Sequence, residues 1–158
     1  MQAISSLALE KHTGPYEKWP SKTRLLINGE PSAHKVSGYE IEAQYQTTLG
    51  ILLITSYDCP FEEANDFYLL DENGRPLSHY SLSVPYGSFL LNRHWPLCER
   101  TLALHYYDDL FYTIEVTSPG RWWRRQPWPK LQHRKDWHTI PSMVEAKITL
   151  DEKLKHIL

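Results

Sequence analysis

Between residues 39 and 46, apolar and polar side chains alternate strictly along the chain. The apolar positions are Tyr39, Ile41, Ala43 and Tyr45. Glutamate and glutamine stand between them, and a period of two is typical of a β-strand with one buried and one solvent-exposed face. Segment 51–57 instead opens on four consecutive apolar residues. This run predicts a central strand that is covered on both faces.

Turn residues separate further segments with strand character. Segments 67–70 and 77–84 flank the sequence Asp71-Glu72-Asn73-Gly74. Asn-Gly tolerates the positive φ angles of a tight turn, so we predict a β-hairpin here. Additional strands are predicted over residues 22–28 and 88–92.

Segment 102–116 predicts a second hairpin, whose register depends on the length of its loop. Its apolar residues stand at even positions: Leu102, Leu104, Tyr106, Tyr112, Ile114 and Val116. A two-residue loop at Asp108 and Asp109 would mix the two faces, whereas a loop of odd length places all six side chains on one buried face. The predicted pairs are Tyr106 with Tyr112, Leu104 with Ile114, Leu102 with Val116 and, on the other face, His105 with Thr113.

These strands are consecutive and short, with no room between them for crossover helices. The predicted fold is therefore mainly β, an antiparallel meander forming a barrel or a sandwich. Residues 149–152 match a capping box and begin a helical stripe of apolar side chains, which predicts a short C-terminal helix. Alternation over 144–148 fits a strand before it, although the helix could equally start earlier.

The length and composition indicate one folded domain. The chain has 158 residues, of which 41% are hydrophobic and 23% charged, a balance that excludes a disordered chain. The longest apolar run is far shorter than the roughly 20 residues of a membrane span, and the first eight residues lack the basic start of a signal peptide. We expect a single domain over 1–158, with a core at about 22–118, an arm at 119–141 and a C-terminal strand or helix at 142–158.

Charge is divided unevenly along this chain. Segment 121–138 has six Lys and Arg residues and one Asp, a charge of +5; because the whole chain carries −2, the rest carries −7. Four of the six tryptophans also lie in this segment, and its prolines exclude a long regular helix. We therefore expect an irregular arm rich in Trp, Arg and Pro.

Three interpretations of this arm compete. It could wrap the acidic body of its own chain, bind another protein or a second copy, or bind nucleic acid. Trp and Arg dominate protein interfaces, whereas the acidic body would repel phosphates. The candidate interface residues are Arg121, Trp122, Trp123, Arg124, Arg125, Trp128 and Trp137.

A cysteine and an acidic cluster follow the predicted central strand. Cys59 could act as a nucleophile if a histidine lay nearby, but neighbouring carboxylates suppress thiolate formation, which favours a structural role. The cluster consists of Asp58, Glu62, Glu63 and Asp66. It could hold a hard cation or supply an acid–base pair, but we favour a solvated loop or an acidic partner for the basic arm, because no calcium-binding pattern is present.

The other chemical signals are weak. The eight histidines lack the spacing of zinc sites, and no glycine-rich phosphate loop is present; we expect no metal and no cofactor. Two cysteines make no secreted disulfide framework, so a cytoplasmic location is expected.

The sequence favours a non-enzymatic binding protein that contacts a protein partner or a second copy of itself through the Trp/Arg-rich segment. The first alternative is a barrel that holds a small apolar or aromatic ligand. Its mouth would be lined by Tyr39, Tyr45, Tyr57 and Tyr106. The second alternative is a hydrolase that uses Cys59 or the nearby carboxylates. Neither nucleic acid nor a membrane is an expected partner.

Overall fold

The computed structural model describes residues 1–57, 64–83, 90–118 and 127–156. Their strands form three antiparallel sheets, followed by helix α1 (Pro141–Lys155). The three-stranded sheet contains β2 (Leu7–Leu9), β3 (Thr23–Ile27) and β4 (Glu30–Val36). The five-stranded sheet contains β1 (Gln2–Ala3), β5 (Glu40–Thr47), β6 (Gly50–Ser56), β7 (Asn65–Leu70) and β8 (Pro76–Leu82). The four-stranded sheet contains β9 (Leu91–Pro96), β10 (Thr101–Tyr106), β11 (Leu110–Thr117) and β12 (Trp128–His133).

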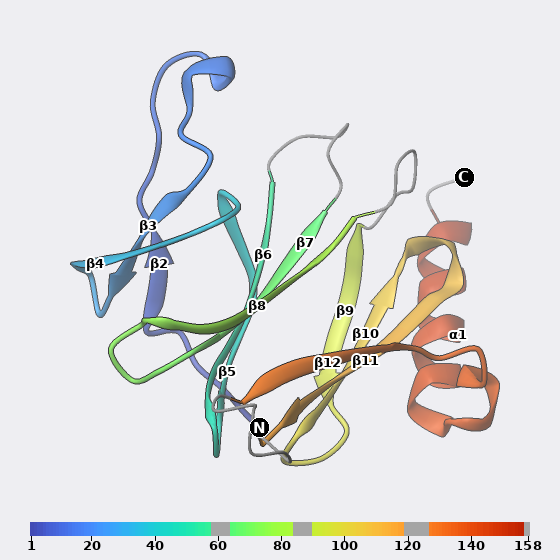
Figure 1. Ribbon diagram of the computed structural model, residues 1–158. Helices are drawn as coiled ribbons and strands as arrows, with labels where there is room; N and C mark the ends of the chain where they lie inside the picture. Colours follow the sequence, from blue (N-terminus) through green and yellow to red (C-terminus); the bar gives the residue numbers. More distant parts are fainter. Residues whose placement is uncertain (58–63, 84–89, 119–126, 157–158) are drawn as a thin grey trace.

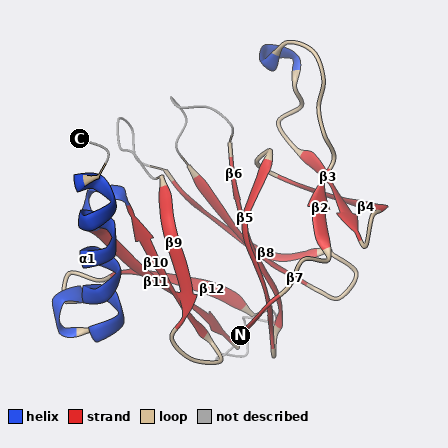
Figure 2. Cartoon of the chain, turned by 180° about the vertical axis from the view of Figure 1, so that it is seen from behind, coloured by secondary structure: helices blue, strands red, loops and turns tan. Residues whose placement is uncertain are grey.

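These elements stack as four layers (Figure 1). The three-stranded sheet lies on one side, the five-stranded and four-stranded sheets follow, and α1 covers the far side; the opposite view agrees (Figure 2). Buried apolar clusters fill the three spaces between neighbouring layers. The mainly β, antiparallel prediction with a C-terminal helix is confirmed, and the described strands pack as a sandwich without closing into a barrel.

Strand β6 lies at the centre of this stack. Ile51 and Leu53 contact the cluster beneath the three-stranded sheet, and Leu52 and Ile54 contact the cluster beneath the four-stranded sheet. All four side chains are buried, which confirms the prediction of a strand covered on both faces. In the adjacent β5, a bulge between Ile41 and Ala43 shifts the alternation, so that the predicted apolar face is shared between both clusters.

Two predicted hairpins are present. β7 and β8 are joined by the Asn-Gly turn, in which the Asp71 carboxylate accepts hydrogen bonds from the backbone N–H groups of Asn73 and Arg75, at 2.9 Å each. β10 and β11 are joined by a three-residue loop, odd in length as predicted. The six side chains predicted to share a buried face all belong to the cluster between the sheets, with Tyr112 partly buried and the others fully buried.

The register of the second hairpin differs from the predicted one by two residues. Tyr106 pairs with Leu110, and Leu104 pairs with Tyr112. His105 pairs with Phe111 rather than with Thr113. The reason is the tight loop 107–109, in which Asp109 adopts a φ of 58° and closes the hairpin earlier than predicted. A shift of two residues leaves every side chain on the same face of the sheet, which is why the buried face was predicted correctly.

The second face of this hairpin is covered by α1 rather than by water. Ala103 and Phe111 pack with Met143 and Ala146 of the helix. Residues 144–148 are therefore helical, and the alternative of a strand there is wrong. The helix begins at Pro141, which suits a first helical turn, and buries Met143, Ala146 and Leu150 on one stripe.

Part of the Trp/Arg-rich segment is regular. Residues 128–133 form β12, which pairs with β11 at the edge of the four-stranded sheet. An edge strand tolerates Pro129 because one side of it needs no ladder hydrogen bonds. Residues 119–126 of the predicted arm lie outside the described residues.

His105 of β10 stacks on Phe111, which packs against α1. The His105 side chain is fully buried, and burial lowers its pKa. The charged groups facing it are Arg93 of β9, Asp109 of the hairpin loop, and Lys147 and Asp151 of α1. Lys147 pairs with both aspartates, at 2.9 Å and 2.5 Å. The aspartates raise the pKa of His105 and the two cations lower it, and burial, the largest cause, leaves the pKa lowered.

We expect the free energy of unfolding to fall as the pH drops below about 6.5, the ordinary histidine pKa. The unfolded chain then binds a proton that folded His105 resists, and the loss stops once the pH reaches the lower folded-state pKa. Urea titrations between pH 5 and 7 measure the slope, which His105→Gln should flatten. Burial also lowers the pKa of His94, which therefore contributes to the pH dependence with the same sign. His94→Gln is the comparison variant. A variant slope equal to the wild-type slope would contradict the assignment to His105.

Candidate functional site

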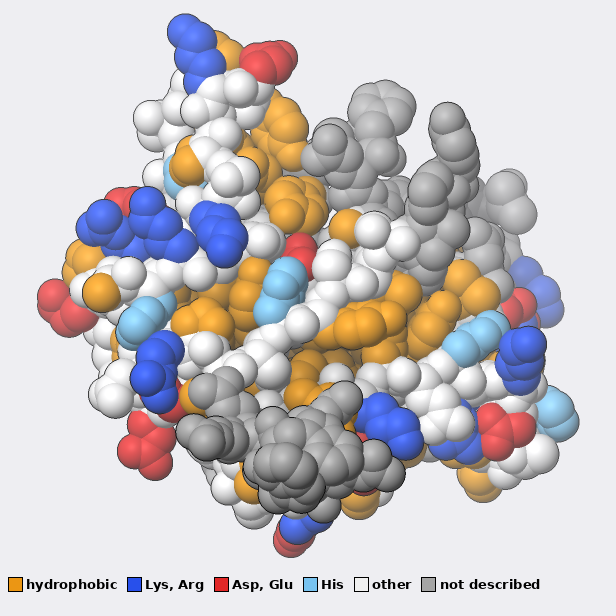
Figure 3. Space-filling view, viewed as in Figure 1, with side chains coloured by type: hydrophobic (Ala, Val, Ile, Leu, Met, Phe, Trp, Pro, Cys, Tyr) orange, Lys and Arg blue, Asp and Glu red, His pale blue; other side chains and the backbone are white. Residues whose placement is uncertain are grey.

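The long connection between β2 and β3 projects from the three-stranded sheet (Figure 1). It carries His12, Tyr16 and Trp19, and a short 3-10 turn, η1 (Tyr16–Lys18), lies within it. In the space-filling view, hydrophobic side chains continue from this projection at the upper left down to the body of the protein (Figure 3). We call residues 10–22 the aromatic loop.

The rings of the aromatic loop pack against Tyr39, which lies just before β5. Its ring centroid lies 5.6 Å from that of His12, 5.6 Å from Tyr16 and 5.1 Å from Trp19. The interplanar angles are 82–84°, the edge-to-face geometry that aromatic pairs prefer. Tyr57, after β6, approaches Tyr39 from a further direction at 5.5 Å and 87°. Tyr39 thus joins the loop to the five-stranded sheet.

Hydrogen bonds fix the polar edges of these rings. The Trp19 Nε1–H donates to the Gly14 carbonyl, and the Tyr39 hydroxyl donates to the Pro20 carbonyl, both at 3.1 Å. His12 Nε2 lies 2.9 Å from the Thr23 hydroxyl oxygen. Because that hydroxyl uses its only hydrogen on the Gly38 carbonyl, at 2.7 Å, His12 Nε2 must be the donor.

Gly38 lets the chain turn into Tyr39. Its φ is 94°, and a Cβ there would lie 2.8 Å from the Ser56 carbonyl oxygen and 2.9 Å from the Thr55 side chain. No other residue fits so close to β6 with this backbone angle. The position of the Tyr39 ring therefore depends on a glycine that precedes it.

A pocket of about 220 Å³ opens beside these rings. Its walls are His12, Trp19 and Tyr39, and its rim consists of three exposed charged residues, Glu10, Lys11 and Glu40. The face of an aromatic ring carries negative electrostatic potential and attracts cations. With two carboxylates against one ammonium at the rim, the pocket as a whole favours a positively charged group.

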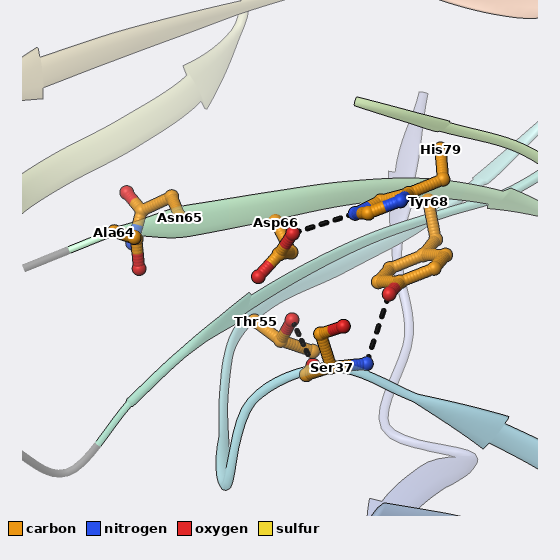
Figure 4. A network of polar contacts seen from close by, with 7 residues as sticks. All are labelled: Ser37, Thr55, Ala64, Asn65, Asp66, Tyr68 and His79. Carbon is orange, nitrogen blue, oxygen red and sulfur yellow. Dashed lines mark hydrogen bonds and ion pairs between the residues drawn. The ribbon is translucent and has the colours of Figure 1, made fainter. Parts of the chain in front are cut away.

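A polar network surrounds Ser37, two residues before Tyr39 (Figure 4). The Tyr68 hydroxyl accepts a hydrogen bond from the Ser37 N–H at 2.8 Å, and the Thr55 hydroxyl donates to the Ser37 carbonyl at 2.7 Å. The Tyr68 hydroxyl is protonated at neutral pH, and burial raises its pKa further. Strands β6 and β7 thereby fix the turn from which Tyr39 projects.

Asp66 and His79 form the charged end of the same network (Figure 4). Asp66 is 3% exposed on β7, and its Oδ1 lies 2.5 Å from Nε2 of His79 on β8. The His79 ring stacks on Tyr68 at 4.3 Å and 7°. Burial, followed by the charge of Asp66, raises the pKa of Tyr57, the ring behind Tyr39.

A carboxylate that orients an imidazole is an arrangement used in general-base catalysis. In the part of the chain that the structure describes, however, no hydroxyl or thiol is hydrogen-bonded to the other nitrogen of His79. The contacts that are present connect the pair to Tyr68 and Tyr57.

The structure separates the four tyrosines of the predicted ligand site into two pairs. Tyr39 and Tyr57 contact each other next to the pocket. Tyr45 and Tyr106 lie in the cluster between the two larger sheets. There the Tyr45 hydroxyl bonds to His94 Nδ1, and the fully buried Tyr106 hydroxyl donates to Asn65 Oδ1, both at 2.8 Å.

The other predicted site residues are only partly described. Asp58, Cys59, Glu62 and Glu63 lie outside the described residues, as do Arg121, Trp122, Trp123, Arg124 and Arg125. Asp66, the remaining member of the acidic cluster, is buried in a strand rather than in a solvated loop. Trp128 is half-buried in β12, and Trp137 stacks on Phe111 at 5.0 Å.

The aromatic loop was missed by reasoning from the sequence alone. A signal was present, since Tyr16 and Trp19 stand between Pro15 and Pro20 in a polar segment. Aromatic residues between prolines in a polar segment indicate a rigid loop rather than a strand. The contact with Tyr39, 20 residues beyond Trp19, depends on the turn at Gly38 and has no local signature.

Within the described ranges, no group of three or more His, Cys, Asp or Glu side chains is arranged to hold a metal ion. In those same ranges, no helix has the length and hydrophobicity needed to cross a membrane. No protein-family model matches the chain, and no curated protein and no solved structure matches it.

Proposed function

We propose that the chain is a non-enzymatic, cytoplasmic binding protein whose pocket receives a positively charged group from a protein partner. The observation that carries this proposal is the pocket formed by His12, Trp19 and Tyr39 beneath a rim with two carboxylates. Its rings are already held by hydrogen bonds, so binding needs little ordering of side chains. The partner is another protein or a second copy of this chain.

The charge distribution supports this assignment. Outside segment 121–138 the chain carries −7, which draws cationic partners toward the body. A cation over an aromatic face contributes about 0.5–1 kcal/mol when exposed and about 2 kcal/mol when desolvated. One such contact gives weak binding, so a stable complex needs a second surface. We propose the Trp/Arg-rich segment for that role, with Trp128 at the sheet edge as its described part.

Truncating a wall of the pocket should weaken this binding. We expect Trp19→Ala to weaken the binding of a cationic side chain at least about fivefold, because the cation loses the strongest aromatic face. The probes are the N-acetyl methylamides of arginine, lysine and trimethyllysine, titrated into the ¹⁵N-labelled protein and followed by chemical-shift changes. Tyr80→Ala, which removes an exposed aromatic ring outside the pocket, is the matched control.

The proposal fails if none of the three probes binds, or if binding survives Trp19→Ala unchanged. Circular dichroism of both variants excludes unfolding as the cause. If the partner is a second copy, light scattering of the wild-type protein should show a dimer that Trp19→Ala dissociates.

The rim predicts opposite effects for opposite charges. Glu10→Gln together with Glu40→Gln should lower the affinity for the cationic probe by about twofold to fivefold, since exposed charge pairs contribute about 0–1 kcal/mol. Lys11→Gln should raise the affinity for the same probe. Both effects should shrink in 0.5 M salt, because exposed charges are screened. Equal changes for the two kinds of substitution would show that rim charge does not act on the ligand.

A further inference from the structure

We propose that the positively charged group received by the pocket is the guanidinium of an arginine side chain on the partner protein, rather than a lysine ammonium or a methylated ammonium. This inference rests on the proposed function and names its ligand class. The observation behind it is that the lining of the pocket offers more hydrogen-bond acceptors than donors.

Glu10 and Glu40 supply most of these acceptors. Glu10 follows β2, and its backbone N–H donates to the Arg24 carbonyl of β3 at 3.0 Å. Glu40 is the first residue of β5 and pairs with Ser56 of β6. Strand pairing in two different sheets thus holds the backbone of both glutamates, while both side chains are exposed. In the described part of the chain neither carboxylate forms an ion pair or a hydrogen bond, so both are available to a ligand.

The wall rings add acceptors rather than donors. The Trp19 Nε1–H and the Tyr39 hydroxyl hydrogen are bonded to carbonyl groups, and the His12 Nε2–H is bonded to Thr23. Neutral His12 therefore keeps a lone pair on Nδ1, and the Tyr39 oxygen keeps one as well. Among the described residues that line the pocket, only Lys11 still has free donors. A ligand with several N–H groups matches this excess of acceptors.

A guanidinium fits this lining better than an ammonium. It has five N–H donors in one plane, and two of them can bind one carboxylate side by side. The plane also has a flat face, which can rest on the ring surface of Trp19 or Tyr39 beside the carboxylates. A lysine ammonium is a more strongly hydrated point charge, so it gives up more water for fewer paired contacts. A trimethylammonium has no N–H group and leaves the acceptors unused.

The exposure of the pocket favours the same group. Glu10, Lys11 and Glu40 are exposed, so a bound ligand stays in contact with water. Any N–H group of the guanidinium that meets no carboxylate keeps its hydrogen bond to solvent, and no buried donor is left unpaired. Charge alone contributes little at such a site, because water and salt screen it. Discrimination between cations therefore depends on paired hydrogen bonds and on contact with the rings.

The test compares four N-acetyl methylamides in chemical-shift titrations of the ¹⁵N-labelled protein. They are arginine, lysine, trimethyllysine and citrulline, in which a neutral urea group replaces the guanidinium. We expect arginine to bind at least about threefold more tightly than lysine and trimethyllysine, because only the guanidinium pairs two donors with one carboxylate. Citrulline keeps the shape without the charge and should bind at least about fivefold more weakly than arginine. Shift changes should map to residues 10–12, 19 and 39–40.

Two substitutions connect this preference to the carboxylates. Glu10→Gln and Glu40→Gln each keep the size of the side chain and remove a charged acceptor. In the double variant, the preference for arginine over lysine should fall to about 1.5-fold or less. Glu30→Gln removes an exposed carboxylate of β4 outside the pocket, so this matched control should keep the preference. Thermal unfolding checks that each variant is folded.

The outcomes separate this inference from the proposed function. Lysine or trimethyllysine binding as tightly as arginine would overturn the guanidinium class and leave a cation-binding pocket. A preference for arginine that persists in the double variant would overturn the pairing with the carboxylates, again leaving the proposed function in place. Citrulline binding as tightly as arginine, or the failure of all four probes, would overturn both conclusions.

Discussion

Replacing Phe111 with Ala should lower the free energy of unfolding by about 3–5 kcal/mol. The side chain is fully buried and occupies the space between the four-stranded sheet and α1. It stacks on His105 at 4.1 Å and 6° and on Trp137 at 5.0 Å and 23°. Truncation therefore removes apolar contacts on both sides and leaves a cavity that β10 and β11, held in the sheet, cannot close.

Urea denaturation measures this loss. The matched control is Ile148→Ala, which truncates an exposed side chain on the same helix, and we expect a change within about 0.5 kcal/mol. Similar losses for the two variants would mean that α1 contributes to stability without packing through Phe111.

Gly50→Ala should be the most damaging small substitution, with an expected loss of about 2–6 kcal/mol of unfolding free energy. Gly50 has a φ of 135°, which other residues rarely adopt, and a Cβ there would lie 2.3 Å from the Leu70 carbonyl oxygen. That oxygen belongs to the backbone of β7 and cannot rotate away. Accommodating the methyl group requires β6 and β7 to separate at their paired ends.

Gly29 provides the matched control for this prediction. Its φ of 84° is also left-handed, but a Cβ at this position would meet no atom within 4 Å. Gly29→Ala therefore carries only the backbone strain, about 1 kcal/mol. Thermal unfolding separates the two variants, and equal melting temperatures would rule out the close approach at Gly50 as the cause.

Local patterns predicted the buried faces of the sheets well. Parity alone placed Leu102, Leu104 and Ile114 in one core, because a shift of two residues preserves the face of every side chain. The exact register escaped prediction, since it depends on the αL conformation of Asp109 in a loop without Gly or Asn. The bulge in β5 escaped prediction for a similar reason: no residue type marks it.

Contacts between distant segments set the limit of what the sequence could predict. Residues 144–148 fit both a strand and a helix, and the choice is decided by Ala103 and Phe111, which lie more than 30 residues earlier. The candidate pocket shows the same limit. Its loop is visible in the sequence as aromatic residues between prolines, but its wall at Tyr39 depends on the turn at Gly38 against β6.

The stacking of four layers has a consequence for hydrogen exchange of the backbone amides. The three-stranded sheet is an outer layer that packs on the five-stranded sheet through a separate buried cluster, and the pocket lies between its aromatic loop and the start of β5. That layer could open locally while the cluster between the two larger sheets stays closed. A ligand that bridges the aromatic loop and Tyr39 would slow amide exchange in β3 and leave exchange in β10 unchanged. Ligand binding would thus reduce local opening of the outer sheet, while the frequency of opening in the other layers stays unchanged.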